Sequence, residues 1–299
     1  MTMQAPMPSA VLSIGRLYCD LIFTGLDSLP VLGREVFSSG MKLAAGGGAY
    51  IAAAHIHHVG RQVALVARLG SDALSREVAT ELASSGIDLR FVEHADDAGP
   101  QVTVAAVMGH DRAFLTKRAG SARPATLPAA LDWSLAKHLH IAEYATLHEM
   151  PDLVREAKAK GLSVSLDPSW DSTLIYDKHL LEACEGVDLF LPNREEVEAI
   201  TGLKDPEAAL DRLLEIFPHV ALKDGASGAW VAAKGFRLHH PAEPVPVIDT
   251  TGAGDAFNAG FLNAWLDDTP LEDCLHAGIS AGSLAVQAAG GASTVRPDR

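Results

Sequence analysis

The second half of the chain alternates between short apolar runs and helical segments, and this alternation constrains the fold most strongly. The runs that read as strands lie at 138–142, 162–166, 187–191 and 220–223, and the clearest helical segments between them lie at 150–160 and 194–200. Strands that are joined by helices form a parallel sheet with helices on both faces. We therefore expect an α/β fold, a three-layer sandwich with a mostly parallel central sheet.

Residues 88–118 differ in character from this alternating region. The apolar runs 91–92, 101–108 and 113–117 are separated only by turn-forming residues at 96–100 and 109–111. Strands that follow one another through short turns are typical of an antiparallel meander. The sequence therefore predicts a small β-sheet here, in addition to the central sheet.

One stretch near the C-terminal end, residues 247–261, combines a strand-like lead, a Gly-Ala-Gly turn and an apolar helix. Gly252 and Gly254 allow positive φ and leave room for a ligand to approach the backbone. The helix that follows presents unpaired N–H groups and the positive end of its dipole, which attract anions. Asp255 would repel a phosphate, so its presence indicates a chemical role. We predict a base that takes a proton from a hydroxyl group while the N–H groups hold a phosphoryl group.

Polar residues also recur at the ends of the predicted parallel strands, where ligands bind in open α/β sheets. Any one of them, such as Asp167 or Asn193, is explained more simply as a helix cap or turn residue. Glu196 follows Asn193 by three residues and shares its face of the first helical turn. Once nucleotide binding is granted, Glu196 suits a role in holding a Mg²⁺-bound water. Residues 225–228, Gly-Ala-Ser-Gly, fit either a hairpin turn or a nucleotide-binding loop.

Charge and cysteine content exclude several classes of function. The net charge of −14 argues against nucleic acids and acidic membrane surfaces as partners. The three cysteines are far apart and follow no metal-binding spacing, which is typical of reduced thiols in a cytoplasmic protein.

Residues 1–9 lack the pattern of a signal peptide, and no apolar run is long enough to span a membrane. The chain also lacks the glycine-lysine phosphate loop of P-loop enzymes.

Taken together, these motifs resemble those of the ribokinase-like (PfkB) carbohydrate kinases. The matching segments are Gly46-Gly47, Gly70-Ser71-Asp72, Asp167-Pro168, Asn193-x-x-Glu196, 225–228, 249–257 and Gly290-Gly291-Ala292. The resemblance implies a single ribokinase-like kinase domain, 1–299, in which a small β-sheet forms a lid over the sugar site. The lid strands are expected at about 16–40 and 88–118, and lid sheets of this family often pair to form a homodimer.

The resemblance also implies an activity and a role for each matching residue. The activity is transfer of the γ-phosphoryl group of ATP to a hydroxyl of a sugar or sugar acid, with Mg²⁺ as cofactor. Asp255 is then the base, and the N–H groups of Gly252, Ala253 and Gly254 form the anion hole. The residues expected to serve ATP and Mg²⁺ are Asn193, Glu196, Lys223, Gly225 and Gly228. Those expected to hold the substrate are Asp20, Gly46, Gly47 and Glu143. The set that resembles the family's monovalent-cation site, for K⁺, is Asp249, Thr251, Ala288, Gly291 and Ser293.

Three departures from the family pattern leave the acceptor open. Ile51 and Ser169 replace asparagines that are usual in the family, and Ile279 stands where an asparagine often approaches the adenine. Residues 118–122, Arg-Ala-Gly-Ser-Ala, are similar to a segment of the 2-keto-3-deoxygluconate kinases. A nucleoside kinase of the adenosine or pseudouridine type remains an alternative. A non-catalytic sugar or nucleotide sensor is a second alternative, although a sensor has no need of a base such as Asp255.

Overall fold

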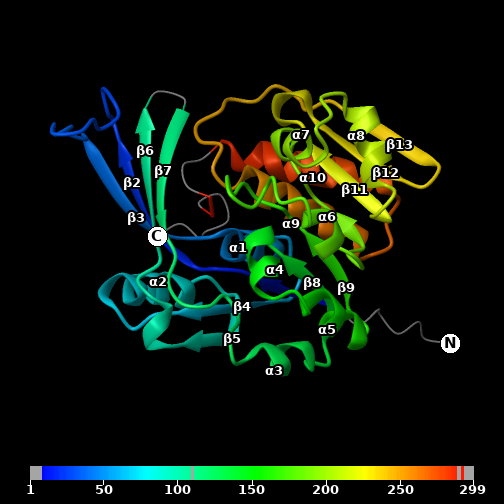
Figure 1. Ribbon diagram of the computed structural model, residues 1–299, viewed down its shortest axis with the longest axis horizontal. Helices are drawn as coiled ribbons and strands as arrows, with labels where there is room; N and C mark the ends of the chain where they lie inside the picture. The colour runs from blue at the N-terminus through cyan, green and yellow to red at the C-terminus, as the bar shows by residue number, and fades with distance from the viewer. Residues whose placement is uncertain (1–8, 109–110, 288–290, 293–299) are drawn as a thin grey trace.

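The computed structural model describes residues 9–108, 111–287 and 291–292, and within them the chain forms two β-sheets. A large sheet lies between two layers of helices, and a smaller sheet stands to one side of this body (Figure 1). The predicted α/β class is therefore confirmed. No helix in these residues is long and apolar enough to cross a membrane.

The large sheet has nine strands. In spatial order they are β13 (Phe236–His240), β12 (Ala229–Ala233), β11 (His219–Lys223), β10 (Leu189–Phe190), β9 (Ser163–Leu166), β8 (Ala136–Ile141), β1 (Ala10–Ile14), β4 (Val63–Leu69) and β5 (Asp88–His94). All pairs from β11 to β5 are parallel, whereas β12 and β13 add an antiparallel hairpin at one edge. Every residue of β1 is buried, as expected for a central strand that is covered on both faces.

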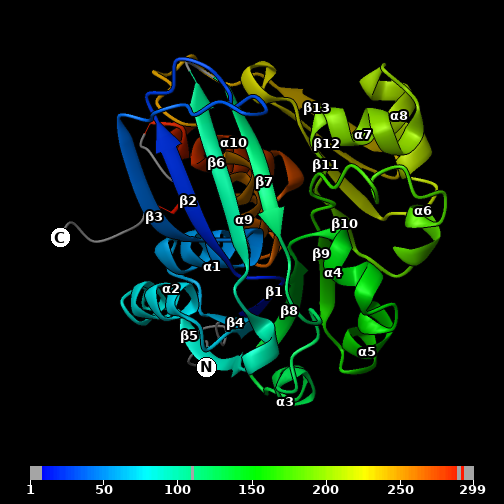
Figure 2. The ribbon, with the colours of Figure 1, turned by 60° about the vertical axis from the view of Figure 1, so that its left-hand side comes forward.

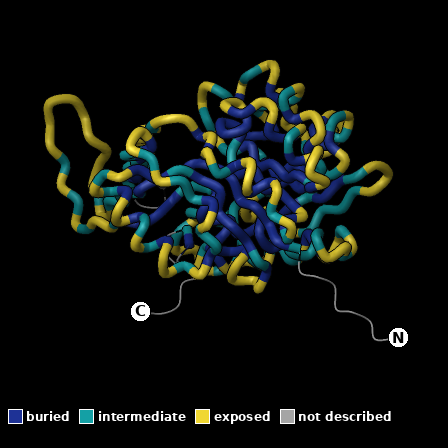
Figure 3. The backbone as a smooth tube through the Cα atoms, turned by 90° about the horizontal axis from the view of Figure 1, so that it is seen from below, coloured by how far each residue is buried: buried dark blue, intermediate teal, exposed yellow. Residues whose placement is uncertain are grey.

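Helices bury both faces of the large sheet. One face packs against α1 (Gly48–His58), α2 (Ala73–Ala83), α9 (Ala253–Trp265) and α10 (Leu271–Ala285). The other face packs against α3 (Leu127–Leu131), α4 (Tyr144–Glu149), α5 (Leu153–Ala159), α6 (Leu180–Ala183), α7 (Arg194–Thr201) and α8 (Pro206–Leu213). Figure 3 shows the buried residues concentrated in these layers, whereas the connection 25–39 is largely exposed.

The small sheet has four strands, β3 (Gly40–Gly46), β2 (Tyr18–Thr24), β6 (Val102–Met108) and β7 (Asp111–Lys117), in that spatial order. Figure 2 shows it in front of α1 and α9. The β2–β3 and β6–β7 pairs are antiparallel, but β2 and β6 are parallel to each other. Two hairpins from distant parts of the chain therefore join side by side.

Two predicted boundaries of the small sheet are wrong. The segment 88–94 is β5, which pairs in parallel with β4 at the edge of the large sheet, so the second hairpin begins only at Val102. The first hairpin extends beyond residue 40, because β3 continues to Gly46. An alternating apolar pattern fits an edge strand of either sheet, and the local sequence does not name the pairing partner. That the chain folds as a single domain stays a prediction.

Candidate active site

Two adjoining cavities lie at the carboxyl ends of the parallel strands. The smaller, of about 370 Å³, is lined by strands of the small sheet and by loops and helices of the large body. The larger, of about 820 Å³, is lined by the body of the molecule together with Arg112 of β7. The residues common to both linings are Gly48, Arg112, Ser169, Gly252 and Asp255. The two cavities therefore meet at Asp255.

The loop before α9 brings Asp255 to this position. Gly252 caps the helix with a φ of 74°, and a Cβ atom there would lie 2.6 Å from the Cα atom of Gly291. Only glycine fits such a conformation at so close an approach. The helix begins at Ala253, whose N–H donates to the Thr250 carbonyl across 3.3 Å. Asp255 lies in the first turn, where the N–H groups and the helix dipole favour a negative charge.

The Asp255 carboxyl group is partly open to the cavities but closely surrounded by protein. A Cβ atom on Gly48 would lie 3.2 Å from its Oδ1 atom, so α1 begins directly against it. Burial raises the pKa of Asp255 to about 8, and the charges of Asp167 and Glu196 act in the same direction, while Lys223 opposes them. A carboxyl group with this pKa is able to exchange a proton near neutral pH.

A buried polar cluster lies beside Asp255. Lys223, the last residue of β11, donates to Asp167 Oδ2 across 2.6 Å and to Asn258 Oδ1 across 3.3 Å. The Asn258 amide also donates to Asp167 Oδ2 across 2.6 Å. Burial lowers the pKa of Lys223, but the charges of Asp167 and Glu196 outweigh it and the net pKa is raised. The lysine therefore keeps a positive charge among carboxylates.

Asn193 and Glu196 form a capping box at the start of α7. Asn193 Oδ1 accepts from the Glu196 N–H across 2.9 Å, and Glu196 Oε2 accepts from the Asn193 N–H across 2.7 Å. Both residues line the larger cavity. Burial and the charge of Asp167 together raise the pKa of Glu196 to about 7, and the charge of Lys223 opposes them. The cap explains this pair structurally, as the simpler interpretation of the sequence anticipated.

The described residues include no group of three or more His, Cys, Asp or Glu side chains that could hold a metal ion. Mg²⁺ commonly takes only one or two carboxylates from the protein and the rest of its ligands from phosphates and water. Glu196 fits such a shared site, with the metal carried in on a nucleotide.

The turn at 225–228 contributes backbone to the larger cavity. Gly225 has a φ of 55° and open space around it. Gly228 has a φ of 97°, and a Cβ atom there would collide with the His240 carbonyl oxygen at 2.0 Å. Packing against β13 is thus enough to require Gly228, and both glycines line the cavity. Its apolar walls include Val245, Val247, Phe257, Ile279 and Val286.

In the smaller cavity, Asp20 lies against the backbone of β3. A Cβ atom on Gly46 would lie 2.0 Å from Asp20 Oδ2, so Gly46 leaves space for this carboxylate without lining the cavity itself. Burial and the nearby Glu81 raise the pKa of Asp20 to about 7. Gly47 and Glu143 line the same cavity, and Glu143 Oε1 accepts from the Thr146 hydroxyl across 2.7 Å.

Two arginines also line the smaller cavity, and local sequence patterns predict a role for neither. Arg112 lies in β7, and Arg118 directly follows that strand. Arg118 donates to the Tyr18 hydroxyl across 3.2 Å and to Asp171 across 2.7 Å. Burial raises the pKa of Tyr18 to about 12. Arg112 donates to the Thr250 hydroxyl across 3.0 Å and forms an ion pair with Asp249 at 3.2 Å. No local spacing pattern links residues so far apart in the chain.

The residues expected to form a monovalent-cation site are only partly described. Asp249 Oδ1 accepts from the N–H of Thr251 across 2.8 Å and from its hydroxyl across 2.7 Å. The Gly291 carbonyl oxygen lies 2.9 Å from His55 Nε2. Ala288 and Ser293 lie outside the described residues.

Comparison with known proteins places this site in a family context. Residues 9–299 match the pfkB family of carbohydrate kinases. The ATP-dependent ribose-1-phosphate kinase of Halopiger xanaduensis is 29% identical over 308 residues, which cover 96% of this chain and 95% of that protein. The cytidine kinase of Thermococcus kodakarensis is 28% identical over 280 residues, covering 87% and 93%. The structure of the ribokinase of Arabidopsis thaliana, solved with ribose and ATP, superposes on this chain with a TM-score of 0.81 and 22% sequence identity. The match covers 97% of this chain and 96% of that chain, and it confirms the ribokinase-like fold.

Proposed function

Since the chain belongs to the pfkB family of carbohydrate kinases, and is therefore an ATP-dependent kinase, we propose that it phosphorylates a hydroxyl group of a sugar or sugar acid. The observation that carries the proposal is the position of Asp255, where a small polar cavity meets a larger cavity with apolar walls. One cavity then holds the acceptor, the other holds ATP, and the carboxyl group lies beside the acceptor hydroxyl where the two cavities meet.

In the proposed reaction Asp255 takes the proton of the acceptor hydroxyl as its oxygen attacks the γ-phosphorus of ATP. The bond between the γ-phosphorus and the bridging oxygen breaks, and ADP leaves. The N–H groups of Gly252, Ala253 and Gly254 are assigned to the anion hole at the start of α9, where the Ala253 N–H would exchange its 3.3 Å hydrogen bond to the Thr250 carbonyl for one to the phosphoryl group. The positive charge of Lys223 lies next to this turn, since a Cβ atom on Gly254 would be 3.5 Å from its Nζ atom. Phosphoryl transfer depends mainly on such positioning and charge stabilisation.

The larger cavity is the proposed nucleotide site. The residues assigned to it are Asn193, Glu196, Lys223, Gly225 and Gly228, all of which line it. The carboxylate of Glu196 would hold Mg²⁺, or water bound to it, together with the nucleotide phosphates. The metal would supply neutralisation of the charge on the transferred group.

The smaller cavity is the proposed acceptor site. Asp20, Gly47 and Glu143 line it, with Gly46 behind Asp20. Carboxylates accept hydrogen bonds from the hydroxyl groups of a sugar, and the bare glycine backbone leaves room for its ring.

The charges around this cavity favour an uncharged sugar over a sugar acid. Arg118 is paired with Asp171 and Arg112 is paired with Asp249, so each guanidinium already has a carboxylate partner. The acids that line the cavity are Asp20, Glu143, Asp171 and Asp255. Above about pH 8, where Asp20 and Asp255 have lost their protons, an anionic acceptor would enter against this negative charge, whereas a neutral polyol would donate hydrogen bonds to it.

Two further assignments extend the proposal. Potassium would bind near Asp249, Thr251 and Gly291, and it would share Asp249 with Arg112. A homodimer would form through the small sheet, which carries exposed apolar side chains at Met41 and Leu115, with Phe37 exposed in the connection before β3. Exposed apolar groups of this kind are common at protein interfaces.

A nucleoside acceptor is the second candidate, and one observation favours it. Phe114 and Trp170 both line the smaller cavity, and their side chains are about half exposed. Exposed aromatic rings in a cavity offer a stacking surface for a base. A non-catalytic sensor is disfavoured, because a binding protein gains nothing from a carboxyl group in an anion hole.

An acceptor panel tests the proposal. ADP formation from ATP and Mg²⁺ would be measured with and without K⁺, using ribose, ribose 1-phosphate, 2-keto-3-deoxygluconate, adenosine, cytidine and pseudouridine. We expect ADP release that depends on a sugar and is faster with uncharged acceptors. Turnover with nucleosides alone would favour the second candidate, and binding of sugar or nucleotide with no acceptor-dependent ADP release would favour a sensor.

A further inference from the structure

The chain passes between the large body and the small sheet four times. The crossings are residues 15–17 before β2, residue 47 after β3, residues 99–101 before β6 and residues 118–126 after β7. Each crossing carries, or lies within two positions of, a residue that lines the smaller cavity: Tyr18, Gly47, Thr103 and Arg118 respectively. The geometry of the acceptor site therefore depends on how these four crossings are held together.

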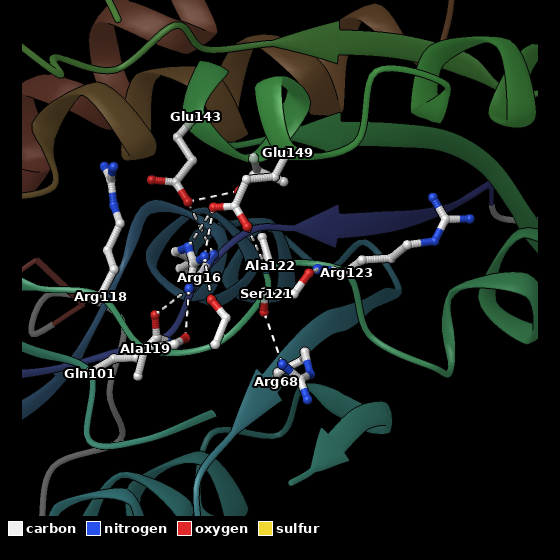
Figure 4. A network of polar contacts seen from close by, with 12 residues as sticks. Arg16, Arg68, Gln101, Arg118, Ala119, Ser121, Ala122, Arg123, Glu143 and Glu149 are labelled. Atoms are coloured by element: carbon white, nitrogen blue, oxygen red, sulfur yellow. Dashed lines mark hydrogen bonds and ion pairs between the residues drawn. The ribbon is translucent and has the colours of Figure 1, made fainter. Parts of the chain in front are cut away.

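All four crossings meet at Arg16. Its Nη1 atom donates to Gln101 Oε1 across 2.8 Å and to the Ala119 carbonyl across 2.9 Å, and its Nη2 atom donates to the Gly120 carbonyl across 2.9 Å (Figure 4). A Cβ atom on Gly47 would lie 2.3 Å from the Arg16 carbonyl oxygen, so the remaining crossing packs directly on its backbone.

Arg16 also connects these crossings to α4 and to the site. Its guanidinium forms an ion pair with Glu149 at 2.6 Å, and Glu149 in turn accepts from the Ala122 N–H across 2.8 Å. The Arg16 N–H donates to Glu143 Oε1 across 3.3 Å, and Glu143 faces the cavity. Figure 4 shows Arg16 between Glu143 and Glu149 on one side and the 119–121 segment on the other.

The shape of the guanidinium is essential to this arrangement. The Arg16 side chain is 4% exposed, and its donors reach four different groups in a fixed planar fork. A lysine would keep the positive charge for Glu149, but it carries all its donors on one nitrogen and cannot reach the same acceptors together. The network therefore depends on arginine and not only on a cation.

We propose that Arg16 is a positioning residue for the acceptor: it fixes the four crossings so that Tyr18, Arg118 and Glu143 keep their places in the smaller cavity. Arg16 itself lines neither cavity and touches no reacting atom. The larger cavity takes most of its lining from residues after 140, and the hydrogen bonds and ion pair of Arg16 go to residues outside that lining. Loss of the network therefore affects acceptor binding and leaves ATP binding unchanged. The effect on the acceptor rests on the proposed function.

The test compares Arg16→Lys with Arg61→Lys. Arg61 is a matched control because it is also buried and makes a similar set of bonds, to Ser9, Asn263 and Asp267, yet it lines neither cavity. In Arg16→Lys we expect the KM for the acceptor to rise on the order of 10-fold. Positioning effects of this size are reasonable, because a 1 Å misplacement of reacting groups can lower the reaction rate by about 10²-fold. The ATP KM should stay constant, and Arg61→Lys should change neither KM.

Gln101→Ala is a milder second variant that leaves Arg16 in place and releases only the 99–101 crossing. It should raise the acceptor KM in the same direction by less. A normal acceptor KM in both variants, or an equal rise in both KM values, would overturn the proposal.

Hydrogen exchange gives a readout that needs no turnover, so failure of the proposed function can be told apart from failure of this inference. Amides in 99–103 and 118–122 should exchange faster in Arg16→Lys than in the wild-type protein, and should be unchanged in Arg61→Lys. Unaltered exchange at these segments in Arg16→Lys would reject the role of Arg16 even if no acceptor were found.

Discussion

Lys223 Nζ lies 2.6 Å from Asp167 Oδ2, and this ion pair lies next to the turn that carries Asp255. Both side chains are almost buried, at 12% and 10% exposure. One ammonium group therefore faces the carboxylates of Asp167, Glu196 and Asp255 together. Lys223 keeps a positive charge at the proposed site of phosphoryl transfer and lowers the pKa of Asp255, whereas the charge of Asp167 raises it.

Removing this ammonium group should strongly destabilise the protein. Lys223→Met leaves buried carboxylates without their counter-charge, and breaking one partner of a buried pair typically costs about 3–5 kcal/mol. Urea denaturation at pH 7 would measure the loss in the free energy of unfolding. The double variant Lys223→Met, Asp167→Asn removes both charges and should recover part of that loss. Wild-type stability in the single variant would contradict this description of the cluster.

The pH dependence of the reaction should follow Asp255. A base must be deprotonated to act, and burial raises the pKa of this carboxyl group to about 8. The value of kcat/KM, which reports the free enzyme, should therefore rise with pH and level off above about pH 8. Initial rates at fixed low acceptor concentration between pH 6 and 9.5 would show whether kcat/KM rises with pH and then levels off. A flat profile over this range would argue against Asp255 as the titrating base.

The pair of Arg118 and Asp171 should control selectivity by charge. Asp171→Asn removes the carboxylate that neutralises Arg118 and frees the guanidinium for an anionic acceptor. We expect the ratio of kcat/KM for sugar acids or sugar phosphates to that for neutral sugars to rise on the order of 10-fold. Competition assays with paired acceptors would measure the ratio. An unchanged ratio would show that Asp171 does not select against anions.

Much of the site follows from local sequence. Gly252 and Asp255 are identified by a turn that only glycine can form and an acid in the first helical turn. Asn193 and Glu196 are spaced as a capping box, and the structure forms it. Such features are read correctly because their physical cause lies within a few residues of chain.

The parts that the sequence missed depend on contacts over long separations. Asn258 reaches Asp167 across 91 positions, and Arg112 reaches Asp249 across 137. The strand at 88–94 has a short, partly alternating pattern that suits either sheet, and only pairing with β4 decides between them. Hydrophobic period and turn residues specify an element but not its neighbour, which is why the sequence prediction assigned residues 88–94 to the wrong sheet.

The central claim requires that an Asp255 variant stays folded. In the native state the carboxyl group of Asp255 keeps its proton up to about pH 8, whereas an aspartate in the unfolded chain loses its proton at about pH 3.9. The native state then binds more protons between these values, so this group lowers stability as pH rises. Asp255→Asn removes that effect, and its melting temperature should exceed that of the wild-type protein more clearly at pH 8.5 than at pH 4.5.

The most direct test is the turnover of Asp255→Asn with the best acceptor of the panel, alongside its affinity for ATP. As the proposed base, Asp255 should contribute about 10²–10⁴-fold to kcat. We predict a loss of that size in acceptor-dependent ADP formation, with ATP binding close to that of the wild-type protein. Turnover within about twofold of wild type in the folded variant would contradict the claim that Asp255 is the catalytic base.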